Sequence, residues 1–129
     1  MKLRRITSIF TLAAIAFMLM PATARAEDAS VTYIDASGTE QTVTAVVVNS
    51  STSSLGTGWY VVNASGVTRS GTITVSGDAN LILADGASLA VTSNNSAGIN
   101  VAPGDTLTIY GQSLGTGMLN ATGNSMSSG

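Results

Sequence analysis

The stretch that decides the fold is GTITVSGDANLIL, residues 71–83, because AGINVAPGDTLTI, residues 97–109, repeats its pattern. When the numbering is shifted by 26, four apolar pairs superimpose: Ile73 and Ile99, Val75 and Val101, Leu81 and Leu107, Leu83 and Ile109. Within each stretch most apolar residues alternate with polar or small ones, which is typical of a strand with one buried face. Self-similarity at a fixed spacing of this size indicates a repeat architecture. The sequence therefore predicts an all-β solenoid with coils of about 26 residues.

Each coil is predicted to contain three short strands. The expected strands are Thr72–Val75, Asn80–Leu83 and Ser88–Val91, followed by Gly98–Val101, Thr106–Ile109 and Met118–Ala121. Leu89 matches Leu119 at a shift of 30 rather than 26, so we place a four-residue insertion in residues 112–117. Stacked coils would set Ile99 on Ile73 and Leu107 on Leu81, about 4.8 Å apart, in a dry apolar core.

The segment before the repeat predicts a β-hairpin. Val31–Ile34 and Thr42–Val48 are rich in β-branched residues, and Asp35–Gly38 between them has turn composition. We expect the hairpin to close the N-terminal mouth of the solenoid, since solenoid ends need atypical caps. Residues 49–54 are predicted to be a loop. Trp59, in an expected strand over residues 58–63, is interpreted as a cap over the first coil's core, with a sugar-stacking platform as the alternative.

Residues 1–26 have the pattern of a secretory signal peptide. A basic start precedes the apolar run Ile6–Met20, and Ala24-Arg25-Ala26 is a small-x-small cleavage signature. An uncleaved anchor is the alternative, but the run is shorter than the roughly 20 residues that span a bilayer. We expect cleavage near Ala26, with a helix allowed for the leader itself. The mature chain would then be secreted or held at the cell surface, without membrane insertion.

Charge and composition exclude several functions for the chain that remains. After residue 26, Arg69 is the single basic residue against seven acidic ones, which leaves a formal charge of −6. Such a chain repels phosphate backbones and anionic lipids, so we expect no nucleic-acid partner. The sequence contains no Cys and no His, so Ser-His and Cys-His nucleophile pairs and His/Cys zinc sites cannot form. We expect this segment not to be an enzyme.

Three aspartates in the predicted turns are candidate metal ligands: Asp78, Asp85 and Asp105. Gly77-Asp78 recurs as Gly104-Asp105 at a shift of 27, so stacking could bring two carboxylates to one edge. The options are ordinary Asp and Gly turn chemistry, a calcium site, or a pair of glycosidase carboxylates. Turn chemistry is the interpretation that we prefer, so no cofactor is expected and calcium is the alternative.

The chain divides into three predicted units: the signal peptide at 1–26, a capping hairpin and loop at 27–54, and β-helix coils at 55–129. Solenoids generally need three or more repeats, and only two coils are clear in the sequence. Residues 123–129 contain no closing hairpin or helix. We therefore expect a fragment that continues into further coils of a longer chain.

Four segments resemble bacterial secreted and surface proteins with a right-handed, pectate-lyase-like parallel β-helix. These segments are GWYVVN at 58–63, GTITVSGDANLILADG at 71–86, LTIYGQ at 107–112 and GMLNATG at 117–123. The resemblance implies a right-handed parallel β-helix and an adhesin-like or carbohydrate-binding role. Members of this family that are enzymes use basic residues that this segment lacks, so no catalytic position is carried over.

We expect a polysaccharide or a host-surface glycan to bind along one flat outward strand face. The candidate residues are Thr74, Ser76, Asn100 and Thr108, assisted by Tyr110. Hydroxyls and amides at intervals of about 4.8 Å would meet sugar hydroxyls there, although a solvated strand exterior has the same composition. Two alternatives stay open: a polysaccharide-degrading enzyme whose active residues lie beyond Gly129, and a structural stalk.

Overall fold

The computed structural model describes residues 27–124, which form an all-β structure without helices. The predicted signal peptide at residues 1–26 lies outside the described residues. The strands are β1 (Asp28–Ile34), β2 (Glu40–Val47), β3 (Ser54–Leu55), β4 (Gly58–Val62), β5 (Val67–Ser70), β6 (Ile73–Val75), β7 (Asp78–Leu83), β8 (Ser88–Ser93), β9 (Ile99–Val101), β10 (Thr106–Tyr110) and β11 (Met118–Gly123).

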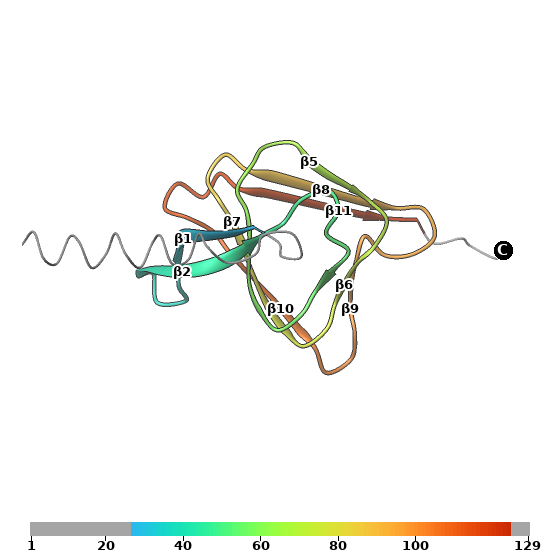
Figure 1. The fold of residues 1–129 in the computed structure, drawn as a ribbon, viewed down its shortest axis with the longest axis horizontal. Coiled ribbons are helices and arrows are strands. Elements are labelled where there is room, and N and C mark those ends of the chain that lie inside the picture. The colour runs from blue at the N-terminus through green and yellow to red at the C-terminus, as the bar shows by residue number, and fades with distance from the viewer. Residues whose placement is uncertain (1–26, 125–129) are drawn as a thin grey trace, which may run out of the picture.

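These strands build three sheets, with the orders β1-β2-β4-β7-β10, β3-β6-β9 and β11-β8-β5. The hairpin pair β1 and β2 is antiparallel, and every other neighbouring pair is parallel. From β3 onward the chain visits the three sheets in turn, three times. We call β3-β4-β5, β6-β7-β8 and β9-β10-β11 the first, second and third windings. Figure 1 shows the sheets as the sides of a triangle.

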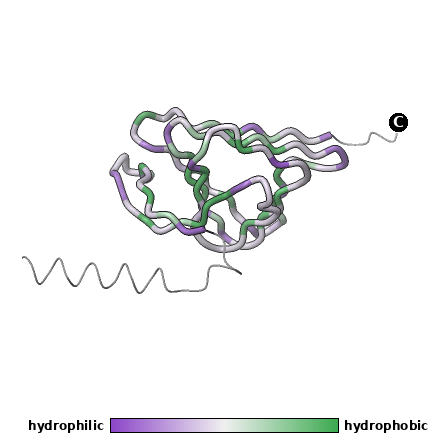
Figure 2. Tube along the Cα trace, turned by 45° about the horizontal axis from the view of Figure 1, so that its top comes forward, coloured by the Kyte–Doolittle hydropathy of each residue, from purple (hydrophilic) through white to green (hydrophobic). Residues whose placement is uncertain are grey.

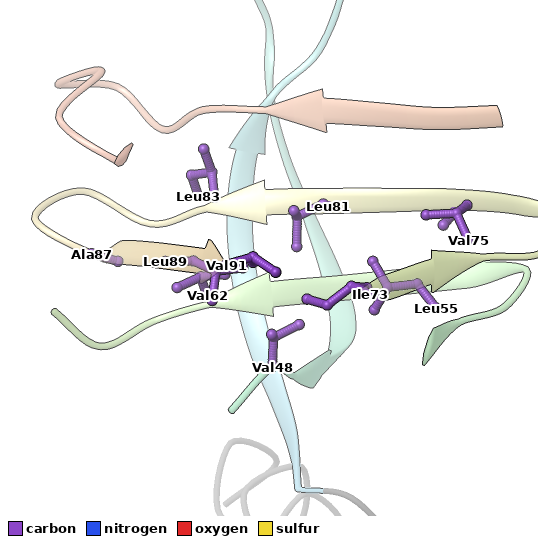
Figure 3. Close-up of a cluster of buried hydrophobic side chains, with 11 residues drawn as sticks. Val48, Leu55, Val62, Ile73, Val75, Leu81, Leu83, Ala87, Leu89 and Val91 are labelled. Carbon is purple, nitrogen blue, oxygen red and sulfur yellow. The ribbon is translucent and has the colours of Figure 1, made fainter. Parts of the chain in front are cut away.

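The apolar core lies inside this triangle. Its fully buried members come from all three sheets and include Leu55, Val62, Ile73, Leu81 and Val91. Figure 3 shows such side chains gathered between the strands, and Figure 2 shows hydrophobic stretches along the strands with hydrophilic ones at several of the turns. Burial of a side chain of this size contributes about 1.5–3 kcal/mol. The alternation that predicts the strands therefore follows from one face of each strand lining the core.

The strand register confirms part of the predicted repeat and corrects the rest. Ile73 pairs with Ile99 at the expected shift of 26, and Leu89 pairs with Leu119 at the expected shift of 30. The second strand differs, because Leu81 pairs with Ile109 at a shift of 28, and Leu107 pairs with Ala79. The prediction that Leu107 lies on Leu81 and Ile109 on Leu83 is therefore wrong.

The extra residues of the third winding are divided between two connections. Four residues, 102–105, join β9 to β10, whereas two residues join β6 to β7. Tyr110 pairs with Ile82 and Met118 pairs with Ser88. The seven residues 111–117 of the third winding therefore correspond to the five residues 83–87 of the second. Each connection thus gains two residues. This corrects the prediction of a single four-residue insertion at 112–117.

The sequence pattern predicts the first winding only in part. Its strands β3 and β5 pair in parallel with β6 and β8, although the pattern predicts neither. β5 reads Val67-Thr-Arg-Ser70, and its register sets Val67 beside Leu89 and Arg69 beside Val91. The inward position of Arg69 interrupts the apolar alternation that identifies the other strands. The described residues therefore contain three windings rather than the two that the sequence predicts.

The predicted hairpin is present, but its position differs from the prediction. β1 and β2 pair antiparallel with Gly38 at positive φ in the turn. β2 pairs with β4 only through Val46 and Val47. The rest of the hairpin lies outside the triangle, against the outer face of β4, β7 and β10, as Figure 1 shows. It therefore covers the edge of β4 at the N-terminal end and the outer face of β4, β7 and β10, rather than closing the whole N-terminal mouth.

Arg69 and the 49–52 turn occupy the N-terminal end of the core instead. Asn49 accepts a bond from the Ser51 N–H at 2.8 Å, and Thr52 accepts one from the Asn49 N–H at 3.0 Å. Nη1 of Arg69 donates to the carbonyl oxygen of Ser50 at 3.4 Å, while its buried Nε finds no partner. A polar turn and a guanidinium group therefore lie together at the end where the first winding begins.

Candidate functional site

The outer face of β4, β7 and β10 is unusual because it is apolar and covered by the β1-β2 hairpin. Ala45, Val61 and Ile82 form a second buried cluster there, separate from the core inside the triangle. The far end of the hairpin is fixed to the loop after β10. The Ile34 N–H donates to the Gly111 carbonyl at 2.9 Å, and Nε2 of Gln112 donates to the Thr32 carbonyl at 2.9 Å. The hairpin thus spans this face from β4 to β10.

Three aromatic rings meet between the hairpin and the sheet, and we call them the aromatic cluster: Tyr33 on β1, Trp59 on β4 and Tyr110 on β10. The ring centroid of Tyr33 lies 4.6 Å from that of Trp59 and 4.9 Å from that of Tyr110. The centroids of Trp59 and Tyr110 are 5.2 Å apart. These separations favour tilted and edge-to-face ring packing. All three side chains are only half-buried, so part of the cluster reaches solvent.

Amide and hydroxyl side chains border the aromatic cluster. Along one row of the sheet, Trp59, Asn80 and Thr108 are successive ladder partners on the same outward face. Asn80 is half-buried and donates from Nδ2 to the Gly58 carbonyl at 3.3 Å, while Thr108 is exposed. On the hairpin, Gln41 lies opposite Tyr33. The rings therefore have neighbours that can donate and accept hydrogen bonds.

The carboxylate of Asp35 holds the hairpin turn beside this site. It accepts bonds from the Ser37 hydroxyl at 2.7 Å, the Thr39 N–H at 2.9 Å and Nε2 of Gln41 at 3.0 Å. These bonds, that of Ser37 first, lower the pKa of Asp35 from 3.8 to about 2. Because the bonds favour the ionised form, the carboxylate fixes both the turn and the amide of Gln41.

The structure divides the predicted glycan-binding residues between two faces. Thr74, Ser76 and Asn100 are exposed on or directly after strands of the β3-β6-β9 sheet, and Thr74 is the ladder partner of Asn100. Thr108 and Tyr110 belong to the five-stranded sheet. The prediction of one flat strip through Thr74, Ser76, Asn100 and Thr108 is therefore wrong. Whether either group binds a ligand stays a prediction.

The predicted stacking of Asp78 and Asp105 differs as well, because Thr106 is the ladder partner of Asp78. Asp105 precedes that position, in the turn before β10. Asp85 holds the 112–117 loop, since its carboxylate accepts the N–H groups of Leu114 at 3.0 Å and Thr116 at 3.3 Å. Among residues 27–124, no three acidic, His or Cys side chains gather as a metal site. Calcium binding stays a prediction from the sequence.

Sequence reasoning misplaces one member of the aromatic cluster and misses another. It interprets Trp59 as a cap over the core of the first coil, but Trp59 lies on the outer face under the hairpin. It does not single out Tyr33 at all. A usable signal exists in Val61-Val62 and Leu81-Ile82-Leu83, where apolar residues occupy both faces of a strand. Strands of this kind indicate layers on both sides of a sheet.

Comparison of the chain with protein-family models, curated proteins and solved structures found no match. Within residues 27–124, no helix is long and apolar enough to cross a membrane.

Proposed function

We propose that residues 54–123 are coils of a right-handed parallel β-helix, the architecture of the bacterial surface proteins that the sequence resembles. Three observations support this proposal: the parallel ladders, the ordered visit to three sheets, and the apolar core between them. The leader pattern at residues 1–26 supports export, so the protein would act outside the cytoplasm or at the cell surface.

On this scaffold, the outer face around the aromatic cluster is proposed to bind a polysaccharide or a host-surface glycan. The half-buried rings of Tyr33, Trp59 and Tyr110 carry this proposal, because aromatic rings combine apolar faces with polar groups suited to sugars. Asn80 and Thr108 add hydrogen-bonding groups along the same row. The formal charge of −6 after residue 26 favours a neutral glycan over an acidic one. The role is binding without turnover.

The single tryptophan makes this proposal directly testable. Neutral oligosaccharides from several polysaccharide classes are titrated against the exported protein while Trp59 fluorescence is recorded. Binding at the cluster predicts a saturable change in emission. Thr108→Ala removes one exposed hydroxyl beside the rings and should weaken the apparent affinity about fivefold, as expected for one hydrogen bond worth about 1 kcal/mol.

Asn100→Ala, on the other exposed face, is the matched control and should leave the affinity unchanged. Circular dichroism confirms that both variants remain folded. An unchanged emission spectrum with every neutral glycan contradicts the proposal and favours the structural stalk. Equal weakening by Asn100→Ala and Thr108→Ala also contradicts the assignment to this face.

A further inference from the structure

The large hydrophobic side chains that stand out as exposed all belong to the third winding or its loop. They are Val101 at 41%, Ile109 at 47%, Met118 at 63% and Leu114 at 75% exposure. Val101, Ile109 and Met118 lie on β9, β10 and β11, so each sheet contributes one. The exposed apolar surface is therefore concentrated at one end of the stack of windings.

The register shows that part of this surface is the core left uncovered. Val75 is 0% exposed, whereas its partner Val101 is 41% exposed. Leu81 is 1% exposed, whereas its partner Ile109 is 47% exposed. The second winding is buried because the third lies on it. In the third winding, the same inward positions are not covered by a further strand among residues 27–124.

The backbone is open at this end as well. β9, β10 and β11 are each the last strand of their sheets in the described part of the chain. Unpaired strand edges are templates for association, and natural sheets protect them with charged residues or prolines. Between Ile99 and Gly123, Asp105 is the single charged residue, and both Asp105 and Pro103 lie in a connection rather than in a strand. The strands themselves carry neither a charged residue nor a proline.

The opposite end matches this surface less well, because only β3 and β5 of the first winding are the last strands of their sheets. There β2 continues the ladder beyond β4, and β1 continues it beyond β2. The 49–52 turn and the guanidinium group of Arg69 occupy the end of the core. Within residues 27–124, a second copy therefore offers one end at which all three sheets end in an open strand, which is its own third winding.

We propose that the open ends of two copies meet face to face, with the third winding of one chain against the third winding of the other. Such a contact is isologous and closes as a dimer, because the same surface is used on both sides. It covers the inward apolar residues, including Val101 and Ile109, and pairs strand edges. The near absence of charge on these strands means that the two identical surfaces do not repel one another.

The test is the mass of the exported protein, measured by light scattering across a concentration series. The expected result is a concentration-dependent species with twice the mass of one chain. Ile109→Asp should abolish this species, because it sets a carboxylate into the contact. Thr106→Asp is the matched control, since it adds the same charge to an outward, exposed position of the same strand and should preserve the dimer.

Hydrogen exchange of the unsubstituted protein guards against a folding defect in Ile109→Asp. Amides of β9, β10 and β11 should become more protected as concentration rises, while those of β5 should not. A monomer at every concentration overturns the proposal and leaves the edges for further windings of a longer chain. Masses that grow beyond the dimer also overturn it, because a face-to-face contact cannot propagate.

Discussion

At the scale of single residues, the hairpin turn depends on one carboxylate. Asp35 accepts four hydrogen bonds: two from Ser37 and one each from Thr39 and Gln41. Its lowered pKa means that the ionised form is favoured in the folded hairpin. The resulting stabilisation is present above pH 3.8 and is lost as the pH falls through about 2. Acid should therefore loosen this turn only when the pH falls to about 2.

Ser37→Ala removes the largest cause of this low pKa, so the pKa of Asp35 should rise from about 2 toward 3.8. Carbon-detected NMR titration of the carboxyl group measures the change. Ser51→Ala, in the turn at the N-terminal end, is the control and should leave the titration of Asp35 where it is. An unaltered pKa in Ser37→Ala would show that the hydroxyl bond is not formed in solution.

The same scale shows why the sequence predicts some strands and misses β5. Ile73-Thr-Val75 follows the alternation of a half-buried strand, so the sequence alone predicts it. In Val67-Thr-Arg-Ser70 the second inward position is Arg69. The apolar pattern places an arginine side chain in solvent, so it does not predict this strand. The neighbouring turn provides one partner for this group, because the Ser50 carbonyl accepts a hydrogen bond from Arg69.

At the scale of strands, the repeat predicts which residues face inward more reliably than it predicts register. A slip of two residues keeps every side chain on its own face. Leu107 and Ile109 are both apolar and two residues apart, so either can follow Leu81 into the core. The lengths of the connecting turns decide between them, and these lengths cannot be assigned from apolar spacing.

The connection into β11 requires a close approach of two backbones at Gly117. A Cβ added there would lie 2.6 Å from the Leu83 carbonyl oxygen and 2.9 Å from that of Ala84. Gly117→Ala should therefore lower the free energy of unfolding by about 1–3 kcal/mol, the usual cost of overpacking. Urea denaturation followed by circular dichroism measures this loss.

Gly111→Ala is the control for this prediction, since a Cβ at Gly111 meets nothing within 4 Å. Its midpoint in urea should stay close to that of the unsubstituted protein. If both variants lose the same stability, the backbone approach at Gly117 is not the cause.

At the scale of the whole molecule, the largest difference from the sequence prediction is the position of the hairpin. Its two strands and its turn follow from local composition, but the surface that it covers depends on contacts far apart in the chain. Gln112 and Thr32 are 80 residues apart, for example. The aromatic cluster is assembled by this same docking, so the sequence could not join Tyr33 to Trp59 and Tyr110. The feature of the sequence that indicates a covering layer is the presence of apolar residues on both faces of β4 and β7.

The stacking of the windings is tested most directly by cysteine cross-linking, because the chain has no cysteine of its own. Ladder partners lie about 4.8 Å apart, within the Cα separations of a disulfide. Asn80→Cys with Thr108→Cys should therefore form an intramolecular disulfide in the folded protein, because these two residues are ladder partners. Asn80→Cys with Thr106→Cys is two positions out of register and should stay reduced. Oxidation of the second pair would contradict this register, and oxidation of neither pair would contradict the stacked windings described above.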